Sequence, residues 1–227
     1  MAGLPYGNAY LLADEELVLI DTGRSRRASV FTRAVRNLGY RPFDVRHILI
    51  THHHTDHTGG LARLAETTEA RIYVHPADAA ITRGEADVPG PATTAGVAGK
   101  VGSFVQRFQP KRLPHISIGH ELQDDEELPL AGGLRVVHTP GHTAGHVSFL
   151  WEQHGGVLIV GDAAASMMGR VNPSVGAFTE DHGAMKRSVA KLAELSFEAA
   201  VFGHGAPIKR DAAARFRRLA ASLQRPF

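Results

Sequence analysis

The stretch THHHTDHTGG, residues 51–60, decides how the rest of the chain is interpreted. It follows the apolar run 45–50 and precedes a helix-like segment, so we expect it to form the loop that closes a strand. Side chains two positions apart in a strand point to the same side. His52 and His54 are therefore predicted to converge on one point, while His53 faces away and is expected to be exposed.

Asp56 and His57 stand where the next helix is expected to begin, so they approach from another backbone direction and can hold a second ion beside the first. Imidazole and carboxylate are ligands that suit zinc, with iron and manganese as competitors. A metal site also needs remote ligands, and three later motifs each end an apolar, strand-like run: GHTAGH at 141–146, GD at 161–162 and GHG at 203–205. Several strand ends are thus predicted to bring His142, Asp162 and His204 to a common edge.

Composition limits the class of protein. The 227 residues are 43% hydrophobic and 21% charged with a formal net charge of +2, which is ordinary for a globular protein and does not suggest nucleic-acid binding. The absence of cysteine excludes disulfides, thiolate ligands and a cysteine nucleophile. No signal peptide and no apolar run long enough to span a bilayer is visible, so a cytoplasmic protein without membrane contact is expected.

Apolar periodicity predicts a mixture of strands and helices. Strands are expected at residues 8–12, 17–20, 45–50, 71–74, 134–137, 147–151, 157–160 and 199–202, and helices at 25–38, 60–66, 76–84, 185–195 and 211–223. Two β-rich halves with flanking helices favour two packed sheets between helix layers. We expect one domain over residues 1–227.

Residues 84–99 are the one break in composition, rich in Gly, Pro, Ala and Thr. Beyond them, Val101, Phe104, Val105 and Phe108 recur at helical spacing. This segment, about residues 84–114, is either a lid inserted over the metal site or an extra surface helix packed on the core. The sequence leaves both interpretations open.

From Asn8 to about Pro207, with four motifs in order, the chain resembles the metallo-β-lactamase fold hydrolases. The resemblance implies an α/β fold: a four-layer αββα sandwich of two mixed sheets flanked by helices, with the metal site at one edge. It implies that one metal is held by His52, His54 and His142, the other by Asp56, His57 and His204, with Asp162 bridging them. It also implies supporting roles for Asp21, which would orient the metal loop, and for His146.

The same resemblance implies two Zn²⁺ per chain, with Fe or Mn as alternatives, and hydrolysis by a bridging hydroxide that Asp56 would orient. A small-molecule ester, lactone or thioester is the first choice of substrate. The residues expected to line the substrate pocket are Phe104, Phe108, Met167, Met168 and Phe178, with Arg170 to hold a carboxylate.

Other activities of the same superfamily are ranked lower. The chain ends soon after His204, which weakens a glutathione thioester as substrate, and the second histidine of 141–146 is generally absent in true β-lactamases. A mononuclear-iron persulfide dioxygenase ranks second, although His57 and His204 fit a dinuclear site better. A flavodiiron protein would normally have Glu at position 54. A zinc-stabilised scaffold without catalysis is the alternative from another class.

Overall fold

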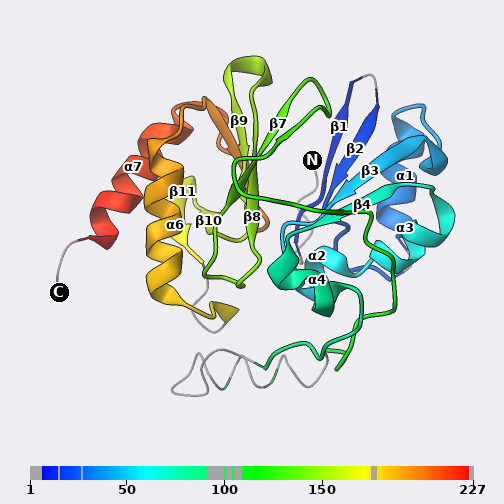
Figure 1. Cartoon of the computed structure of the whole chain (residues 1–227). Helices are drawn as coiled ribbons and strands as arrows, with labels where there is room; N and C mark the ends of the chain where they lie inside the picture. The colour runs from blue at the N-terminus through cyan, green and yellow to red at the C-terminus, as the bar shows by residue number, and fades with distance from the viewer. Residues whose placement is uncertain are drawn as a thin grey trace.

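Two five-stranded sheets pack face to face in the computed structural model, which describes residues 7–14, 16–26, 28–90, 100, 104, 109–174 and 178–224 (Figure 1). The first sheet has the order β1-β2-β3-β4-β5, in which β1 and β2 are antiparallel and the following neighbours are parallel. Its strands are β1 (Tyr10–Ala13), β2 (Leu17–Ile20), β3 (Val45–Leu49), β4 (Arg71–Val74) and β5 (His120–Glu121).

The second sheet has the order β12-β9-β8-β7-β6, with β12 parallel to β9 and the other neighbours antiparallel. Its strands are β6 (Glu127–Leu128), β7 (Leu134–His138), β8 (Val147–Trp151), β9 (Val157–Ile159) and β12 (Ala199–Val201). A separate hairpin consists of β10 (Ala164–Met167) and β11 (Arg170–Pro173).

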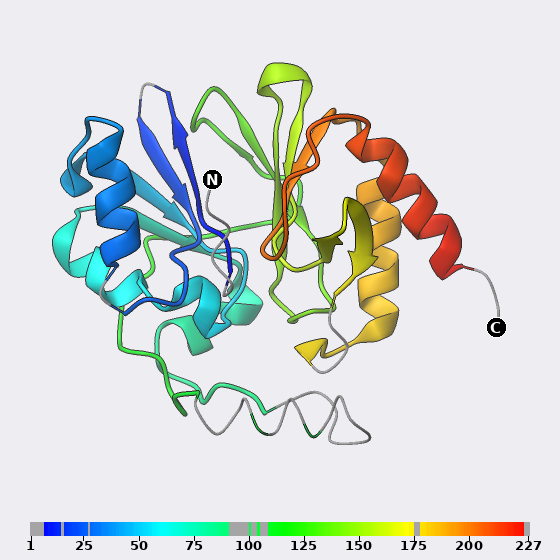
Figure 2. The same cartoon turned by 180° about the vertical axis from the view of Figure 1, so that it is seen from behind.

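Helices cover the outer face of each sheet (Figure 2). The helices of the structure are α1 (Ser29–Asn37), α2 (Thr55–Thr58), α3 (Leu61–Thr67), α4 (Pro76–Thr82), α6 (His182–Glu194) and α7 (Ala212–Leu223), with short 3-10 turns η1 (Pro42–Asp44) and η2 (Gln153–Gly155). The Asp181 carboxylate begins α6 by accepting hydrogen bonds from the amides of Gly183 and Ala184.

Three apolar clusters correspond to the three interfaces between four layers. One cluster joins the first sheet to α1 and α3, the second fills the space between the sheets, and the third joins the second sheet to α6 and α7. Strand β8 contributes to two of these clusters because its side chains alternate between the two faces of the sheet. Phe149 belongs to the cluster between the sheets, and Leu150 belongs to the cluster under α6 and α7. The four-layer arrangement with two mixed sheets agrees with the sequence expectation.

The loops that carry the histidine motifs lie at one end of this sandwich. The backbone N–H of Val147 donates to the carbonyl of Thr51 at 2.9 Å, which joins the two sheets at that end. The loop between β2 and α1 lies beside it, because the amide of Thr22 donates to the carbonyl of His57 at 2.7 Å. The residues predicted to be metal ligands, which follow separate strands, are thereby brought to one edge.

The expected boundaries differ from the structure in several places. The helix expected at 25–38 begins only at Ser29, after Ala28 with a left-handed backbone (φ 49°). Most of the segment suggested as a lid lies outside the described residues, so that interpretation stays a prediction. Among the described residues, no helix is long and apolar enough to cross a bilayer.

Candidate metal centre

Three imidazole rings meet at the histidine end of the sandwich. His52 and His54 lie in the loop after β3, and His142 lies in the loop between β7 and β8. Nε2 of His52 is 3.1 Å from Nδ1 of His54, and the latter atom is 3.0 Å from Nε2 of His142. Three ring nitrogens from two loops therefore face one another, as the alternation of residues 52 to 54 predicts.

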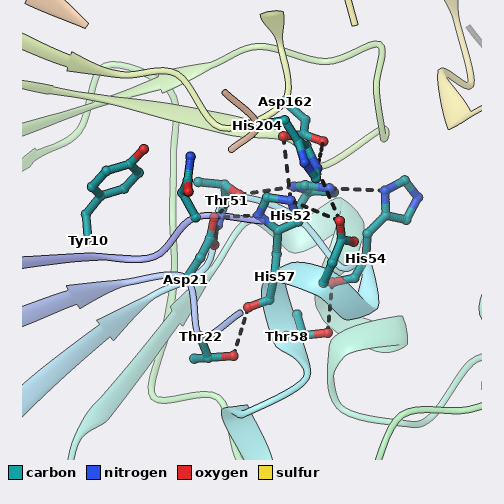
Figure 3. Close-up of polar contacts among 12 residues, drawn as sticks. Tyr10, Asp21, Thr22, Thr51, His52, His54, His57, Thr58, Asp162 and His204 are labelled. Carbon is teal, nitrogen blue, oxygen red and sulfur yellow. Dashed lines mark hydrogen bonds and ion pairs between the residues drawn. The ribbon is translucent and has the colours of Figure 1, made fainter. Parts of the chain in front are cut away.

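A second group lies beside the first. Helix α2 carries Asp56 and His57, and the loop after β12 carries His204. Nε2 of His204 is 3.1 Å from Oδ2 of Asp56, and Nε2 of His57 is 3.9 Å from the same oxygen. Figure 3 shows His57 and His204 turned toward the same space as His52 and His54.

Asp162 stands between the two groups. Its Oδ2 is 3.4 Å from Nε2 of His142 and 3.2 Å from Nε2 of His204. Its Oδ1 is 3.5 Å from Nε2 of His57. The structure thus brings all seven residues that the sequence singled out to one place, with the carboxylate that was expected to bridge located between the two sets.

The histidines of the first group and those of the second group differ in their protonation. Burial, followed by the neighbouring histidines, holds the pKa of His52 and of His54 well below the ordinary value. Burial lowers the pKa of His142 to about 4. These three imidazoles are therefore neutral at physiological pH, which is the form that binds metal ions.

In the second group, hydrogen bonds to Asp162 and Asp56 raise the pKa of His204 to about 10. Burial lowers the pKa of His57, but the carboxylates of Asp162, Asp21 and Asp56 raise it well above its ordinary value. The acidic side chains around these two histidines attract positive charge, and a divalent cation would replace the protons that His57 and His204 otherwise hold.

Asp21 lies directly behind the loop of residues 51–57. Its Oδ2 accepts hydrogen bonds from Nδ1 of His57 at 2.7 Å and from Oγ1 of Thr51 at 2.8 Å, and its Oδ1 accepts from the amide of Thr51 at 2.8 Å. Asp21 also has a positive φ of 58°, an uncommon conformation that Asp tolerates better than most residues. The carboxylate fixes the orientation of both the loop and the His57 ring.

Two further ring nitrogens, Nδ1 of His52 and Nδ1 of His142, are held from outside the cluster. Because the Thr51 hydroxyl donates to Asp21, it accepts from Nδ1 of His52 at 3.0 Å, which leaves Nε2 with its lone pair toward the cluster. Nδ1 of His142 is 2.8 Å from Oγ of Ser174, in the loop after β11. The sequence analysis did not identify Ser174, because no motif distinguishes it from other loop serines.

Asp78 is a buried acid that the sequence analysis also missed. It lies in the first turn of α4 and ties together the two loops that carry His52, His54 and His142. Its Oδ2 accepts from the amide and Nδ1 of His53, at 2.9 and 3.0 Å, and from Oγ1 of Thr143 at 2.9 Å, and its Oδ1 accepts from the amide of Gly145 at 2.8 Å.

The expectation that His53 is exposed is therefore wrong. Alternation does turn His53 away from His52 and His54, but that side of the loop is the interior against α4, where Asp78 receives the ring. Burial raises the pKa of Asp78, yet hydrogen bonds from His53 and Thr143 hold it well below the ordinary value. A charged carboxylate thus holds both loops in place.

His146 has a supporting position. Its Nε2 accepts from the amide of Asp162, and its Nδ1 is 2.8 Å from Oγ1 of Thr139, so both ring nitrogens are engaged. Close packing explains why glycine occupies two nearby positions. A Cβ at Gly161 would press on the His146 ring, and a Cβ at Gly203 would overlap Oδ1 of Asp162.

The residues expected to line a substrate pocket are distributed differently. The Phe178 ring lies 6.4 Å from the ring of His54, next to the cluster, while Phe108 falls outside the described residues. Phe104 is exposed. Met167 and Arg170 flank the exposed turn between β10 and β11. Arg215 of α7 donates a hydrogen bond to the carbonyl of Gly169 in this turn. Met168 in the same turn is 96% exposed.

Within the described part of the chain, Met167 and Arg170 make no hydrogen bond or ion pair with the histidine cluster. Their role in substrate binding stays a prediction that the structure does not support further. Phe178, by contrast, lies against a histidine of the cluster.

The cluster fits divalent metal ions. Among the described residues, Nε2 of His57 and Oδ1 of Asp162 are buried without a hydrogen-bond partner. Buried polar atoms are normally paired, and an unpaired one costs free energy. Nitrogen and oxygen donors in groups of three, with no sulfur, suit zinc, iron or manganese.

Comparisons with known proteins agree with this geometry. The family model described as the metallo-beta-lactamase superfamily matches residues 2–204. The probable metallo-hydrolase YflN of Bacillus subtilis is 30% identical over 202 residues, which cover 84% of this chain and 76% of that protein. The hydroxyacylglutathione hydrolase of Halorhodospira halophila is 34% identical over 166 residues, 71% of this chain but only 48% of that protein.

Solved structures show the same fold. The metallo-beta-lactamase family protein TTHA1429 of Thermus thermophilus is 31% identical with a TM-score of 0.71, and the match covers 98% of this chain and 77% of that one. The MIM-2 metallo-beta-lactamase, 24% identical with a TM-score of 0.71 over 97% of this chain and 82% of that one, supports the fold alone. From its fold, its cluster of histidines and aspartates and these matches, the chain belongs to the metallo-β-lactamase superfamily.

Proposed function

We propose that this protein binds two divalent metal ions, zinc before iron or manganese, and hydrolyses a small-molecule ester, lactone or thioester. The observation that carries the proposal is that six candidate ligand side chains form two groups of three, with the carboxylate of a seventh residue, Asp162, between them. His52, His54 and His142 would hold one ion and Asp56, His57 and His204 the other. Two-metal sites of this composition are common in hydrolases.

When bound, zinc lowers the pKa of a coordinated water to about 7 and polarises a carbonyl oxygen. The reaction would join the water oxygen to the acyl carbon, break the bond from that carbon to the alcohol or thiol group, and pass the water proton to the leaving group. Asp56 is the residue placed to orient the water and carry its proton, because its carboxylate is partly exposed at the edge of the cluster.

The electrostatics of Asp56 are consistent with that role. Burial raises its pKa, but the charge on His57 and the hydrogen bond from His204 hold that pKa well below the ordinary value. The group is therefore a carboxylate when substrate arrives. The sequence contains no cysteine, so a thiol nucleophile is excluded. Hydrolysis by an activated water needs no covalent intermediate with the protein.

The choice of bond is supported by the relatives. Two of them bear the names of a metallo-hydrolase and of a hydroxyacylglutathione hydrolase, the second a carboxylic-derivative hydrolase by its name. The solved MIM-2 and FEZ-1 metallo-beta-lactamases are 24% and 17% identical to this chain, which supports the fold and not their substrate. A carboxylic ester, lactone or thioester is therefore our first choice, and a β-lactam is not.

The test is a substrate panel run together with elemental analysis. Zinc-loaded protein is assayed on a p-nitrophenyl ester, a lactone, a thioester, a phosphodiester and nitrocefin, with His54→Ala as the matched control. We expect metal-dependent hydrolysis of a carboxylic substrate that is lost in His54→Ala. Uniform inactivity equal to the control would favour a zinc-stabilised scaffold, and about one iron per chain, where the dinuclear site requires about two ions, would favour the persulfide dioxygenase alternative.

A further inference from the structure

A cavity of about 670 Å³ lies between α1 and the β1–β2 hairpin, away from Phe178 and its neighbours. One end of the cavity is at His204 and Gly205, and the other is at Leu38, at the end of α1. Figure 2 shows α1 beside this hairpin, with the connection from β2 running past the histidine end of the sandwich. The size lies in the range of small-molecule binding pockets.

The wall that α1 contributes is an exposed apolar stripe. Val30, Ala34 and Leu38 recur at every fourth position and therefore share one side of the helix. Val30 is 49% exposed and Leu38 60% exposed. The stripe is about 12 Å long at the helical rise per residue. Leaving such a row of apolar side chains exposed to water is unfavourable, so it is suited to covering an apolar ligand.

The opposite wall and the floor are apolar as well. Leu11 of β1 and Leu19 of β2 line the cavity, and Phe31 of α1 closes its floor. The arginines of α1 do not share this space, because Arg33 and Arg36 line a different hollow beside η1. The wall formed by α1 therefore presents hydrocarbon to the cavity.

The polar lining of the cavity comes from Asn8, Tyr10, Thr22, Arg24, Ser25 and His204, and the hydrogen bonds of Asn8, Tyr10 and Thr22 are made within the protein. The Asn8 side chain donates to the carbonyls of Phe202 and Gly205, at 3.0 and 2.9 Å, and the Thr22 hydroxyl donates to the carbonyl of His57 at 2.8 Å. These bonds shape the loop that carries His204. The lining residues between Val30 and Leu38, away from these groups in the chain, are all apolar.

We propose that this cavity is the binding groove for the aliphatic chain of the substrate. The inference rests on the proposed hydrolase function and makes it more specific: the scissile carboxylic group would lie at His204, which is 39% exposed at the mouth, and a linear alkyl chain would extend along Val30, Ala34 and Leu38. The continuity of the groove with the metal centre selects this occupant. The substrate class is then an ester or thioester with a medium-length alkyl chain.

The first measurement compares p-nitrophenyl acetate with p-nitrophenyl decanoate on the zinc-loaded full chain. A methylene group buried in a groove raises kcat/KM about fourfold, so we expect kcat/KM for the decanoate to exceed that for the acetate by at least about tenfold. Ala34→Trp fills the groove with an indole. It should remove most of this ratio by lowering kcat/KM for the decanoate.

The matched control is Asn37→Trp. Asn37 is exposed on the same helix but lines the other hollow, so the same indole should leave the chain-length ratio unchanged. If the acetate is hydrolysed and Ala34→Trp behaves like Asn37→Trp, the groove proposal is overturned while the hydrolase proposal stands.

The second measurement needs no turnover. Binding of 1-decanol, which has the chain but no scissile bond, is followed by calorimetry, with ethanol as reference. Binding that Ala34→Trp abolishes and Asn37→Trp preserves supports the groove, even if no ester in the panel is hydrolysed. Three results overturn it: no decanol binding, binding only after residues 1–6 are deleted, or a dimer that Leu38→Glu dissociates and that excludes decanol.

Discussion

The backbone N–H of Asp162 donates a hydrogen bond of 2.8 Å to Nε2 of His146. The other nitrogen of this ring lies against the hydroxyl of Thr139, and burial lowers the pKa of His146 to about 3, so the ring is neutral. A ring with both nitrogens engaged cannot also ligate a metal. His146 instead fixes the backbone from which the central carboxylate of the cluster projects.

Replacing His146 by Ala should therefore lower the stability of the protein without changing the number of metal ions it binds. Loss of two buried hydrogen bonds and creation of a cavity should lower the free energy of unfolding by about 2 to 4 kcal/mol. The number of metal ions per chain should stay that of the wild type. Urea unfolding and elemental analysis check the two parts. Complete loss of metal from a folded variant would identify His146 as a ligand.

Asp78 should matter for metal affinity although it lies outside the cluster. It accepts four hydrogen bonds from the two histidine loops, so Asp78→Ala should destabilise the protein by about 3 to 5 kcal/mol and weaken zinc binding. Asp78→Asn, which retains an acceptor oxygen, should fall between Ala and the wild type in both measurements.

The matched control for Asp78 is Asp87→Ala, because Asp87 is an exposed acid paired with Arg112 at the surface. Such pairs contribute about 0 to 1 kcal/mol. Competition with a chromophoric chelator gives the zinc affinity. An affinity in Asp78→Ala equal to that of Asp87→Ala would show that the two loops keep their positions without the buried carboxylate.

Asp21 should raise the metal affinity of the cluster through its hydrogen bonds with His57 and Thr51. In Asp21→Asn the side chain keeps its size but loses its charge, so its hydrogen bond with Nδ1 of His57 weakens. Losses of this type cost about 10- to 100-fold in metal affinity, and we expect this range for the ion held by His57. Zinc titration monitored by calorimetry would test it; two unchanged affinities would contradict the role assigned to Asp21.

Tyr10 provides a test at alkaline pH. Its hydroxyl donates to the carbonyl of Phe202 at 2.7 Å, and burial raises the pKa of Tyr10 from 10.0 to about 12. Because the folded protein holds the proton more tightly, this contribution to stability is complete below pH 10.0 and is lost as the pH rises through about 12. Wild type should therefore lose more stability over this range than Tyr10→Phe, as urea unfolding at each pH would show. Parallel pH profiles would contradict this.

Much of the fold follows from apolar periodicity. The strands at Leu17–Ile20, Arg71–Val74 and Val147–Trp151 have the predicted bounds, because each is an apolar run between turns and is buried by the layers on both sides. The pairs β5–β4 and β10–β11 were not predicted. His120–Glu121 is too short and polar to show a period, and Ala164–Met167 pairs with its own hairpin partner and otherwise makes only an isolated bridge from Ser166 to Gly205.

The residues of the cluster were easier to predict than the residues that hold them in position. Ligands such as His142 and His204 stand in short motifs after apolar strands, so their convergence follows from chain order. Asp78 and Ser174 have no such signal, since an acid in a first helical turn and a serine in a loop are ordinary. The burial of His53 depended on what faced the other side of the loop, which only the tertiary structure reveals.

The central claim is that side chains from separate strand ends would hold two metal ions, with the Asp162 carboxylate between the two groups of ligands. Elemental analysis of the wild type and of Asp162→Ala after zinc loading and desalting tests it most directly. We predict about two zinc ions per chain in the wild type and a clear reduction, with loss of hydrolysis, in Asp162→Ala. A wild-type chain that retains no metal, or an Asp162→Ala variant that retains both ions and full activity, would contradict the account.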